Sequence, residues 1–348
     1  MSSFLFHKVP SRWLQAVVRC SVSPLAGLHW LLAGVLALSG VSVAAAAGEP
    51  LVICHGSVAS ALVPLAQVRG DYLAEGLDVQ LRRFASGFDA LQALLDGDCA
   101  LSTAAVPPVV YQALRRGDFR IVAEISHSSD YERIVAYRDR GILAPADLRG
   151  RRIAVPKATS AHYFLDMFLA AQGLTPSDVT QVFLPAAEVG PAFRDGRVDA
   201  AAHWEPNVQN IAREAGERGQ VFHFSGLVVS PFLLLARQDL IEKSPARVQG
   251  VLRALLRAER FMAETPAEAP RLLAPLFGIS VPECDYVLSL HDYAVTLDQP
   301  LPFVLENATR WQIGLPPAAE QAAMPNYLNF IDAGPLRAVK PQAVSHVD

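Results

Sequence analysis

The chain has 348 residues, of which 51% are apolar and 18% charged, and its formal net charge is −4. It is too apolar for a disordered protein, and its length predicts about two domains or lobes. Residues 1–47 carry three basic side chains and no acidic one, so the remainder carries −7. Because a nucleic-acid partner requires a basic surface that neutralises phosphates, this acidic body argues against one.

Residues 1–47 are typical of a secretory signal peptide. Lys8, Arg12 and Arg19 form a basic start, a long apolar stretch follows, and a run of alanines ends at Ala47. We expect cleavage near Ala47 and export to the periplasm. An uncleaved anchor helix is the alternative, because no charged residue lies between Arg19 and Glu49. The small residues at the end of the segment favour cleavage.

Three cysteines follow this segment, Cys54, Cys99 and Cys284. They are widely spaced and odd in number, and no C-x-x-C pair occurs, so neither a zinc site nor a redox motif is predicted. We interpret all three as small buried apolar side chains. The spacing does not support the alternative, a disulfide between Cys54 and Cys99, although export would place them in an oxidising compartment.

Strand and helix patterns alternate through the first half of the chain, which predicts an open, largely parallel α/β sheet. Residue 141 is a glycine, and after it the pattern starts again. Beyond residue 245 the pattern becomes mostly helical. We expect strands over residues 51–55, 78–84, 99–104, 120–125, 133–137, 152–155, 180–184, 198–203, 221–224 and 227–236. We expect helices over residues 62–73, 86–95, 109–116, 160–172, 248–264, 267–276, 284–290 and 326–331, and one between the strands at 180 and 198.

Two successive α/β sections without a flexible linker indicate two lobes joined by extended crossings. We place the crossings near residues 135–142 and 228–233. Lobe 1 would then consist of residues 48–138 and 233–348, and lobe 2 of residues 139–232. Two such lobes enclose a cleft that can close by hinge bending.

Ligands of open α/β sheets bind where strands end at their carboxyl edge. The loops at these positions supply small, hydroxyl-bearing and aromatic residues. The predicted ligand-binding residues are Ser57, Ser86, Gly87, Thr103, Ser128, Thr159, Ser160, Ala161, His162, Trp204 and Glu205.

Two helix starts among these residues indicate an anionic ligand. Thr159-Ser160 and Ser86-Gly87 each follow a strand and open a helix, whose free N–H groups attract negative charge. Plain helix capping is the alternative for both. His162 either donates to the anion or caps the helix, and Glu205 either caps the next helix or pairs with a ligand amine.

Aromatic side chains near the same loops complete the predicted site. Trp204, with Phe88 and Tyr163, could cover an apolar tail of the ligand. Motifs of common enzymes are missing: there is no G-x-S-x-G, H-E-x-x-H, Walker A or G-x-G-x-x-G sequence. We therefore predict a binding protein with no catalytic residue, no metal site and no cofactor.

Several ordered motifs resemble the SsuA/TauA/THI5-like (NMT1) substrate-binding proteins of ABC importers. They are GDYLAEGLDV at 70–79, FASGFDALQALLDG at 84–97, DLRGRRIAVPKATSAHYFL at 147–165 and GRVDAAAHWEP at 196–206. The resemblance implies a type II periplasmic-binding-protein fold of two α/β lobes, with a helical C-terminal segment packing on lobe 1. It also implies a monomer that delivers a small organic anion, best represented by a sulfonate, to an ABC permease.

In the family, helix N-termini that match Ser86 and Thr159–Ala161 hold the anionic head, and the tail reaches toward Trp204. The loop Cys54-His-Gly-Ser57 departs from the family's usual Gly-Tyr-Gln type, and the cysteine-rich iron motif of THI5-like synthases is missing. Alternatives are a binder of nitrate, bicarbonate or a thiamine-pyrimidine-like ligand, a sensory binding protein, and an enzyme of the THI5-like or chorismate dehydratase-like type.

Overall fold

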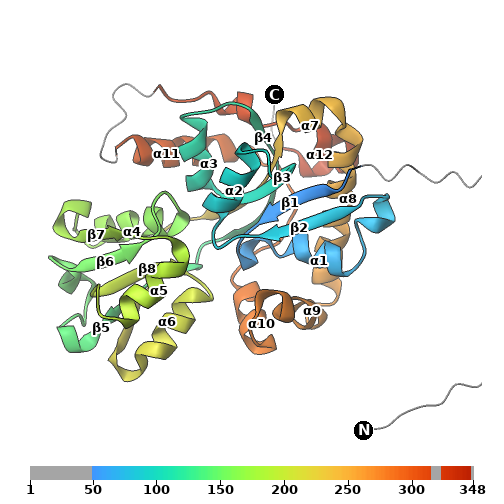
Figure 1. The fold of residues 1–348 in the computed structure, drawn as a ribbon. Helices are drawn as coiled ribbons and strands as arrows, with labels where there is room; N and C mark the ends of the chain where they lie inside the picture. Colours follow the sequence, from blue (N-terminus) through green and yellow to red (C-terminus); the bar gives the residue numbers. More distant parts are fainter. Residues whose placement is uncertain (1–48, 315–322, 346–348) are drawn as a thin grey trace, which may run out of the picture. The chain divides into compact units, whose positions relative to one another are not determined.

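The computed structural model describes residues 49–314 and 323–345, so the predicted signal peptide lies outside the described residues. Two five-stranded sheets, each covered by helices, organise the chain (Figure 1). This confirms the α/β class and the two lobes. Each sheet is mixed, however, where a largely parallel sheet was predicted.

The first sheet has the strand order β2-β1-β3-β10-β4. Strand β1 pairs in parallel with β2 and β3, whereas β10 pairs antiparallel with β3 and β4. Helices on both faces bury its centre, so all residues of β3 are buried. The bounds are β1 Leu51–His55, β2 Val79–Arg83, β3 Leu101–Ala105, β4 Phe119–Ser128 and β10 Ser230–Arg237, with helices α1 Leu62–Val68, α2 Gly87–Leu95 and α3 Val106–Ala113.

The second sheet has the strand order β7-β6-β8-β5-β9. Strand β6 pairs in parallel with β7 and β8, and β5 pairs antiparallel with β8 and β9. The bounds are β5 Glu132–Tyr137, β6 Arg152–Val155, β7 Thr180–Phe183, β8 Ala200–Trp204 and β9 Gly219–Phe222, with helices α4 Ser160–Ala171, α5 Ala186–Arg194 and α6 Asn207–Ala215.

The chain crosses between the sheets at residues 129–131 and 223–229. The first crossing lies earlier than the predicted 135–142, because β5 already pairs with β8 and β9 of the second sheet. The second crossing ends where β10 begins, at Ser230, so the return to the first sheet precedes the predicted boundary at residue 233. Both differences arise because a buried strand has the same apolar sequence pattern in either sheet, so the sequence does not show which sheet the strand joins.

Most helices of the C-terminal segment pack on the first sheet and its helices, as expected. Helix α8 contacts α1 and α12, α11 contacts α3, and α12 contacts β4. The residues expected to form a helix at 326–331 contain only a short 3₁₀ turn. The bounds are α7 Gln238–Lys243, α8 Pro245–Glu264, α9 Glu268–Phe277, α10 Val281–Ser289, α11 Leu301–Ile313 and α12 Gly334–Val339.

Helix α11, which was not predicted, also contacts the second lobe. Its Trp311 Nε1 donates a hydrogen bond of 2.8 Å to the buried Asp166 carboxylate of α4. Gln181 of β7 donates to the other oxygen of the same carboxylate, at 2.5 Å. The buried carboxylate therefore has partners from both lobes, which a buried charge requires.

A disulfide joins Cys54 and Cys99, whose Cα atoms lie 5.9 Å apart, so the expectation of three reduced cysteines is wrong for this pair. Pairing of β1 with β3 sets Cys54 opposite Ser102 and brings Cys99 close. This proximity arises from sheet pairing between segments 45 residues apart. Cys284 is free and buried, as expected.

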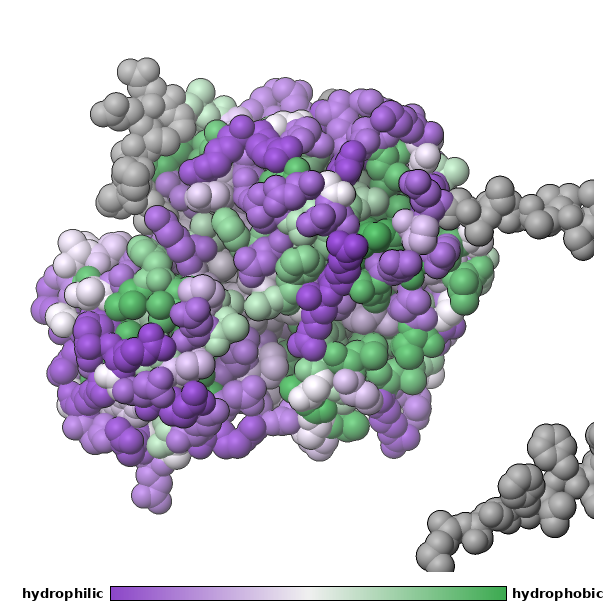
Figure 2. Space-filling model, in the orientation of Figure 1, coloured by the Kyte–Doolittle hydropathy of each residue, from purple (hydrophilic) through white to green (hydrophobic). Residues whose placement is uncertain are grey.

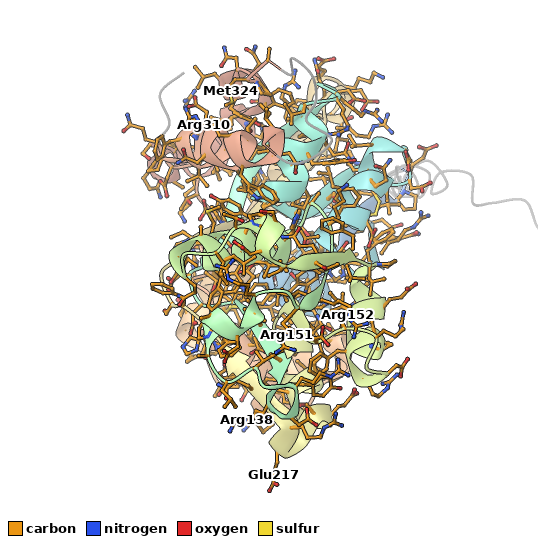
Figure 3. The ribbon with its side chains drawn as sticks, turned by 90° about the vertical axis from the view of Figure 1, so that its left-hand side faces the viewer. Arg138, Arg151, Arg152, Glu217, Arg310 and Met324 are labelled. Atoms are coloured by element: carbon orange, nitrogen blue, oxygen red, sulfur yellow. A yellow bond between two sulfur atoms is a disulfide. The ribbon has the colours of Figure 1, made fainter. Side chains whose placement is uncertain are left out.

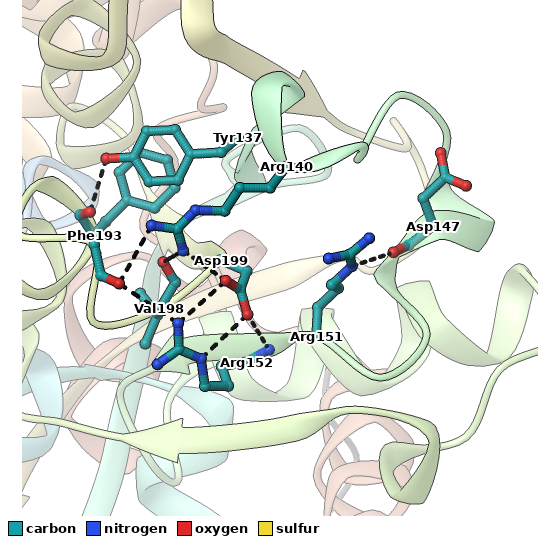
Figure 4. Close-up of polar contacts among 9 residues, drawn as sticks. Tyr137, Arg140, Asp147, Arg151, Arg152, Phe193, Val198 and Asp199 are labelled. Carbon is teal, nitrogen blue, oxygen red and sulfur yellow. Dashed lines mark hydrogen bonds and ion pairs between the residues drawn. The ribbon is translucent and has the colours of Figure 1, made fainter.

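A polar cluster fixes the end of the second sheet that lies away from the strands' carboxyl edge (Figure 4). Asp199 accepts hydrogen bonds from Arg140 Nη1 at 2.5 Å and from the backbone N–H of Arg152 at 2.9 Å. Burial alone would raise the pKa of Asp199. Hydrogen bonds from Arg152 and Arg140 outweigh burial, so the pKa falls below its usual value, to about 2. Figure 3 shows Arg152 beside Arg151 on this lobe, with Arg138 lower in the view. The cluster ties β8 to the start of β6.

Hydrophilic side chains cover most of the face in Figure 2, and apolar residues form separate groups among them. Within the described ranges, no single helix is long and apolar enough to cross a membrane. Helices α9 and α10, which are joined by a sharp bend, have the length and apolar composition of a membrane span only when the two are taken together.

Candidate functional site

A small pocket lies where loops of both sheets meet; we call it the central pocket, and its space of about 280 Å³ includes open solvent. None of its lining side chains is charged. Five of the predicted binding residues line it: Ser57, Gly87, Thr159, Ser160 and Trp204. The others that line it are Phe88, also expected, and Ala105, Pro108, Tyr131 and Phe232, which the sequence analysis missed.

Two hydroxyl groups of the central pocket are buried and unpaired. Neither Ser57 Oγ nor the Tyr131 hydroxyl satisfies hydrogen-bond geometry with any described protein group, although the two lie near each other. Burial raises the pKa of Tyr131 far above its usual value, so this hydroxyl is a neutral donor. Because buried polar groups are nearly always hydrogen-bonded, the pair is suited to a polar ligand.

Two helix starts border the central pocket. Helix α2 begins at Gly87 and α4 at Ser160, and both residues line the pocket. The first N–H groups of a helix lack intrahelical acceptors and attract negative charge. Ser86 itself caps α2, because its Oγ accepts from Asp89 N–H at 3.1 Å and donates to the Asp89 carboxylate at 2.7 Å.

Close backbone packing brings the first of these helix starts to the pocket. A Cβ on Gly56 would lie 2.9 Å from the carbonyl carbon of Ser86, and a Cβ on Gly87 would lie 3.0 Å from Ala104 Cα. The first distance is shorter than real Cβ contacts, and the second would require Ala104 to shift by a few tenths of an ångström. Glycine at these two positions therefore allows the β1 loop, the start of α2 and the end of β3 to pack against one another.

His162 lies outside the central pocket and is completely buried. Its Nδ1 accepts a hydrogen bond of 3.3 Å from Ala158 N–H, and its Nε2 lies 3.1 Å from Gln181 Oε1. Burial lowers the pKa of His162, so the ring is neutral. These contacts hold the turn before α4, where Ala158 has φ of 56°, and they occupy both ring nitrogens of the histidine.

Of the other hydroxyl-bearing and small residues predicted for the site, some line the central pocket and others lie outside it. Thr159 lines the pocket, but its Oγ1 donates to Pro156 O at 2.6 Å. Ser128 Oγ donates to Leu290 O at 2.5 Å, which joins the end of β4 to the residue that follows α10. Thr103 and Ala161 are fully buried outside the pocket, in β3 and α4.

Glu205 is a scaffold residue that combines the capping role with an ion pair. Its Oε2 accepts from Gln209 N–H at 3.0 Å, in the first turn of α6, and its Oε1 lies 3.3 Å from Arg133 Nε. Arg133 also contacts the Asp130 carboxylate at 3.2 Å. Only 2% of the Glu205 side chain is exposed, so the pair is nearly out of water. The structure thus separates Glu205 from the central pocket.

Two larger pockets adjoin the central one. The first shares Ser57 and Trp204 with it and has about 880 Å³ of empty space; we call it the Arg83 pocket. The second shares Phe88 and Thr159 with it and has about 750 Å³. In the described part of the chain, no group of three or more His, Cys, Asp or Glu side chains is placed to hold a metal ion.

A buried carboxyl group, Glu132, lies next to the central pocket at the start of β5. Its oxygens lie 3.3 and 3.4 Å from the hydroxyl of Ser230, across the two crossings. Burial raises the pKa of Glu132 to about 7, against the opposing effect of hydrogen bonds from Ser160 and Ser230. Near neutral pH, this carboxyl group therefore changes charge beside the pocket.

Glu132 is expected to make folding stability depend on pH. The folded pKa of about 7 lies above the reference value of 4.5, so the folded state binds the proton more tightly between these values. The free energy of unfolding should then fall as pH rises through this range, by up to about 3 kcal/mol. Urea unfolding of the wild type and of Glu132→Gln at pH 5 and pH 8 measures the effect. Equal pH dependence in the two proteins would contradict it.

The chain is similar in sequence to a known protein family and to several binding proteins. A family model described as NMT1/THI5 like matches residues 59–269. The "Putative aliphatic sulfonates-binding protein" of Escherichia coli (strain K12) is 30% identical over 255 residues, which cover 72% of this chain and 79% of that protein. The taurine-binding periplasmic protein of the same strain is 27% identical over 217 residues, covering 60% of this chain and 67% of that protein.

The fold matches solved periplasmic binding proteins. The alkanesulfonate-binding protein SsuA from Xanthomonas axonopodis pv. citri, bound to MOPS, superimposes with a TM-score of 0.69 at 23% identity, covering 86% of this chain and 98% of that one. This confirms the predicted fold class. An enzyme is also similar in part: the 1,4-dihydroxy-6-naphtoate synthase of Streptomyces coelicolor is 33% identical over 123 residues, 33% of this chain and 43% of that protein.

Proposed function

The chain belongs to the NMT1/THI5-like family, and from this premise we propose that it is the periplasmic solute-binding component of an ABC importer. It binds a small organic anion, most simply an alkyl or aryl sulfonate, between its two sheets and releases it unchanged. The ligand is passed to a membrane permease by a monomeric binding protein. The names of the sulfonate-binding and taurine-binding relatives support this assignment.

The composition of the central pocket carries the proposal. Two unpaired hydroxyls, Ser57 and Tyr131, and two helix starts supply donors without a full positive charge. A sulfonate has three acceptor oxygens and is a monoanion, which suits neutral donors and helix ends. The aromatic rings of Phe88, Trp204 and Phe232 can cover a carbon tail.

Binding without chemistry is favoured over the enzyme alternative by the same residues. Among the residues that line the central pocket, Tyr131 alone has a titratable side chain, and burial keeps it protonated. Apart from the neighbouring Glu132, which is hydrogen-bonded to Ser160, the central pocket therefore offers no group that could act as a general base at neutral pH. The two crossings at 129–131 and 223–229 are typical of a hinge that opens and closes on a ligand.

A ligand screen on residues 48–348 tests the function. At about 100 times its dissociation constant, a ligand that binds only the folded protein adds about 2.7 kcal/mol of stability, roughly 5 °C or more in melting temperature. We expect a sulfonate to give the largest shift, ahead of nitrate, bicarbonate and thiamine-type pyrimidines. A larger shift from a neutral or cationic compound would contradict the anion site, and recovery of an altered compound would contradict binding without chemistry.

Variants then locate the site. Ser57→Ala and Tyr131→Phe should each weaken sulfonate binding by about 10-fold, because a hydrogen bond to a charged group contributes about 1.5–3 kcal/mol. Tyr286→Phe is the matched control, since Tyr286 lies on α10 outside the central pocket. Titration calorimetry measures all three. Unchanged affinity in both site variants would exclude the central pocket as the anion site.

A further inference from the structure

The Arg83 pocket differs from the other large pockets in its charge. Its lining contains one cationic side chain, Arg83, and no carboxylate. The other large pocket beside the central one is lined by both Lys157 and Asp89, and a further pocket near β10 includes four acidic residues. Since residues 48–348 carry a net charge of −7, an acid-free pocket with an arginine is a local exception.

Arg83 is held in place but keeps donors free. It is the last residue of β2, and its Nη1 donates to Leu276 O at 3.0 Å. Its guanidinium carbon lies 5.3 Å from the centre of the Phe277 ring, within range of a cation–π contact. No described acidic residue lies within ion-pair distance of it. A guanidinium oriented in this way can bind a carboxylate or a second sulfonate through its remaining N–H groups.

The opposite wall of the pocket comes from the second lobe, and none of the side chains that line it is acidic. Ala186 and Ala187 begin α5, whose start has no side-chain cap, and Asn207 begins α6, whose first turn is capped by the Glu205 carboxylate. His203 in the same wall is neutral, because burial lowers its pKa to about 4. The start of the nine-residue helix α5, whose first turn also carries Glu188, therefore lies in the same pocket lining as the arginine and adds only a weak preference for anions.

The Arg83 pocket adjoins the central pocket, because Ser57 and Trp204 line both. We propose that the ligand carries two anionic groups on a short carbon chain, one held in the central pocket and the other by Arg83. A sulfocarboxylate is the simplest member of this class. The inference rests on the proposed function, since it extends the same binding site to a second subsite.

Paired ligands test the second subsite. We compare ω-sulfocarboxylates that have two to five methylene groups with alkanesulfonates of the same length and with ω-aminoalkanesulfonates. The wild type should bind the best sulfocarboxylate at least 10-fold more tightly than its alkanesulfonate counterpart, and the aminosulfonate less tightly than either. Arg83→Gln should abolish this preference while it leaves alkanesulfonate affinity within about twofold, and Arg83→Lys should restore part of it.

Arg82→Gln is the matched control, because adjacent residues of a strand point to opposite faces and Arg82 is also exposed. It should keep the full preference. If alkanesulfonates bind but no sulfocarboxylate is preferred, or if Arg83→Gln keeps the preference, the second subsite is refuted and the proposed function stands. If no sulfonate of any series binds, both the subsite and the proposed function are refuted.

Discussion

Replacing Cys54 and Cys99 together by alanine is expected to lower the free energy of unfolding by about 4 kcal/mol. The disulfide closes a loop across a sequence separation of 45 residues, and the chain-entropy model for a loop of this size gives about that value. Both cysteines are at most 2% exposed, so the bond is shielded in the folded protein. Urea unfolding of residues 48–348 under oxidising conditions measures the loss, which corresponds to roughly 10 °C in melting temperature.

Reductant separates the disulfide from the packing of the two side chains. The wild type, unfolded and refolded with dithiothreitol, should lose nearly the same stability as the double variant, and the double variant should be insensitive to the reductant. A thiol count on the unfolded, unreduced wild type should give one free thiol, Cys284. Three free thiols would show that the bond does not form, and a loss under 1 kcal/mol would show that it does not stabilise the fold.

The loss of this bond should also weaken ligand binding. Cys54 lies three residues before Ser57, and β1 carries the loop that supplies the Ser57 hydroxyl. The bond fixes β1 against the segment that leads into β3, so its removal loosens the first-lobe side of the central pocket. The disulfide therefore connects the stability of one lobe to the order of the site.

Most of the fold could be predicted because the signals of regular elements are local. Short apolar or alternating runs located β1, β2 and β6 within two residues of their bounds. Helix α11 was missed because Pro300 and Pro302 favour a loop, although proline fits the first turn of a helix, where its missing N–H costs nothing. The lobe boundary was misplaced because no local signal tells which sheet a buried strand such as β5 joins.

The site was predicted where it depends on strand ends and missed where it depends on tertiary contacts. Ser57, Ser160 and Trp204 follow or end strands, so position alone indicated them. Tyr131 lies on the first crossing, and only the approach of the two sheets makes it part of the pocket. Conversely, the position of a polar residue after a strand does not show which group it will contact. His162 contacts Gln181, which belongs to another strand, so its partner could not be predicted from the local sequence.

Glu205→Ala is expected to lower the free energy of unfolding by about 3 kcal/mol and to leave the affinity for a sulfonate unchanged. The substitution leaves the Arg133 guanidinium, whose side chain is 10% exposed, with the partly exposed Asp130 as its remaining carboxylate. Removing one member of a buried ion pair costs about 3–5 kcal/mol, because the other charge stays buried and unpaired. Urea unfolding measures the stability, and calorimetry on the folded variant measures the affinity.

Two further variants identify the cause of the expected loss. Glu205→Gln keeps an acceptor for the Gln209 N–H but removes the charge, so it reports the ion pair alone. The double variant Arg133→Met, Glu205→Leu removes both charges and should be more stable than Glu205→Ala, because an apolar pair of similar volume replaces a buried ion pair at little cost. A stable Glu205→Ala protein with at least 10-fold weaker binding would instead make Glu205 a ligand contact, as the sequence alone allowed.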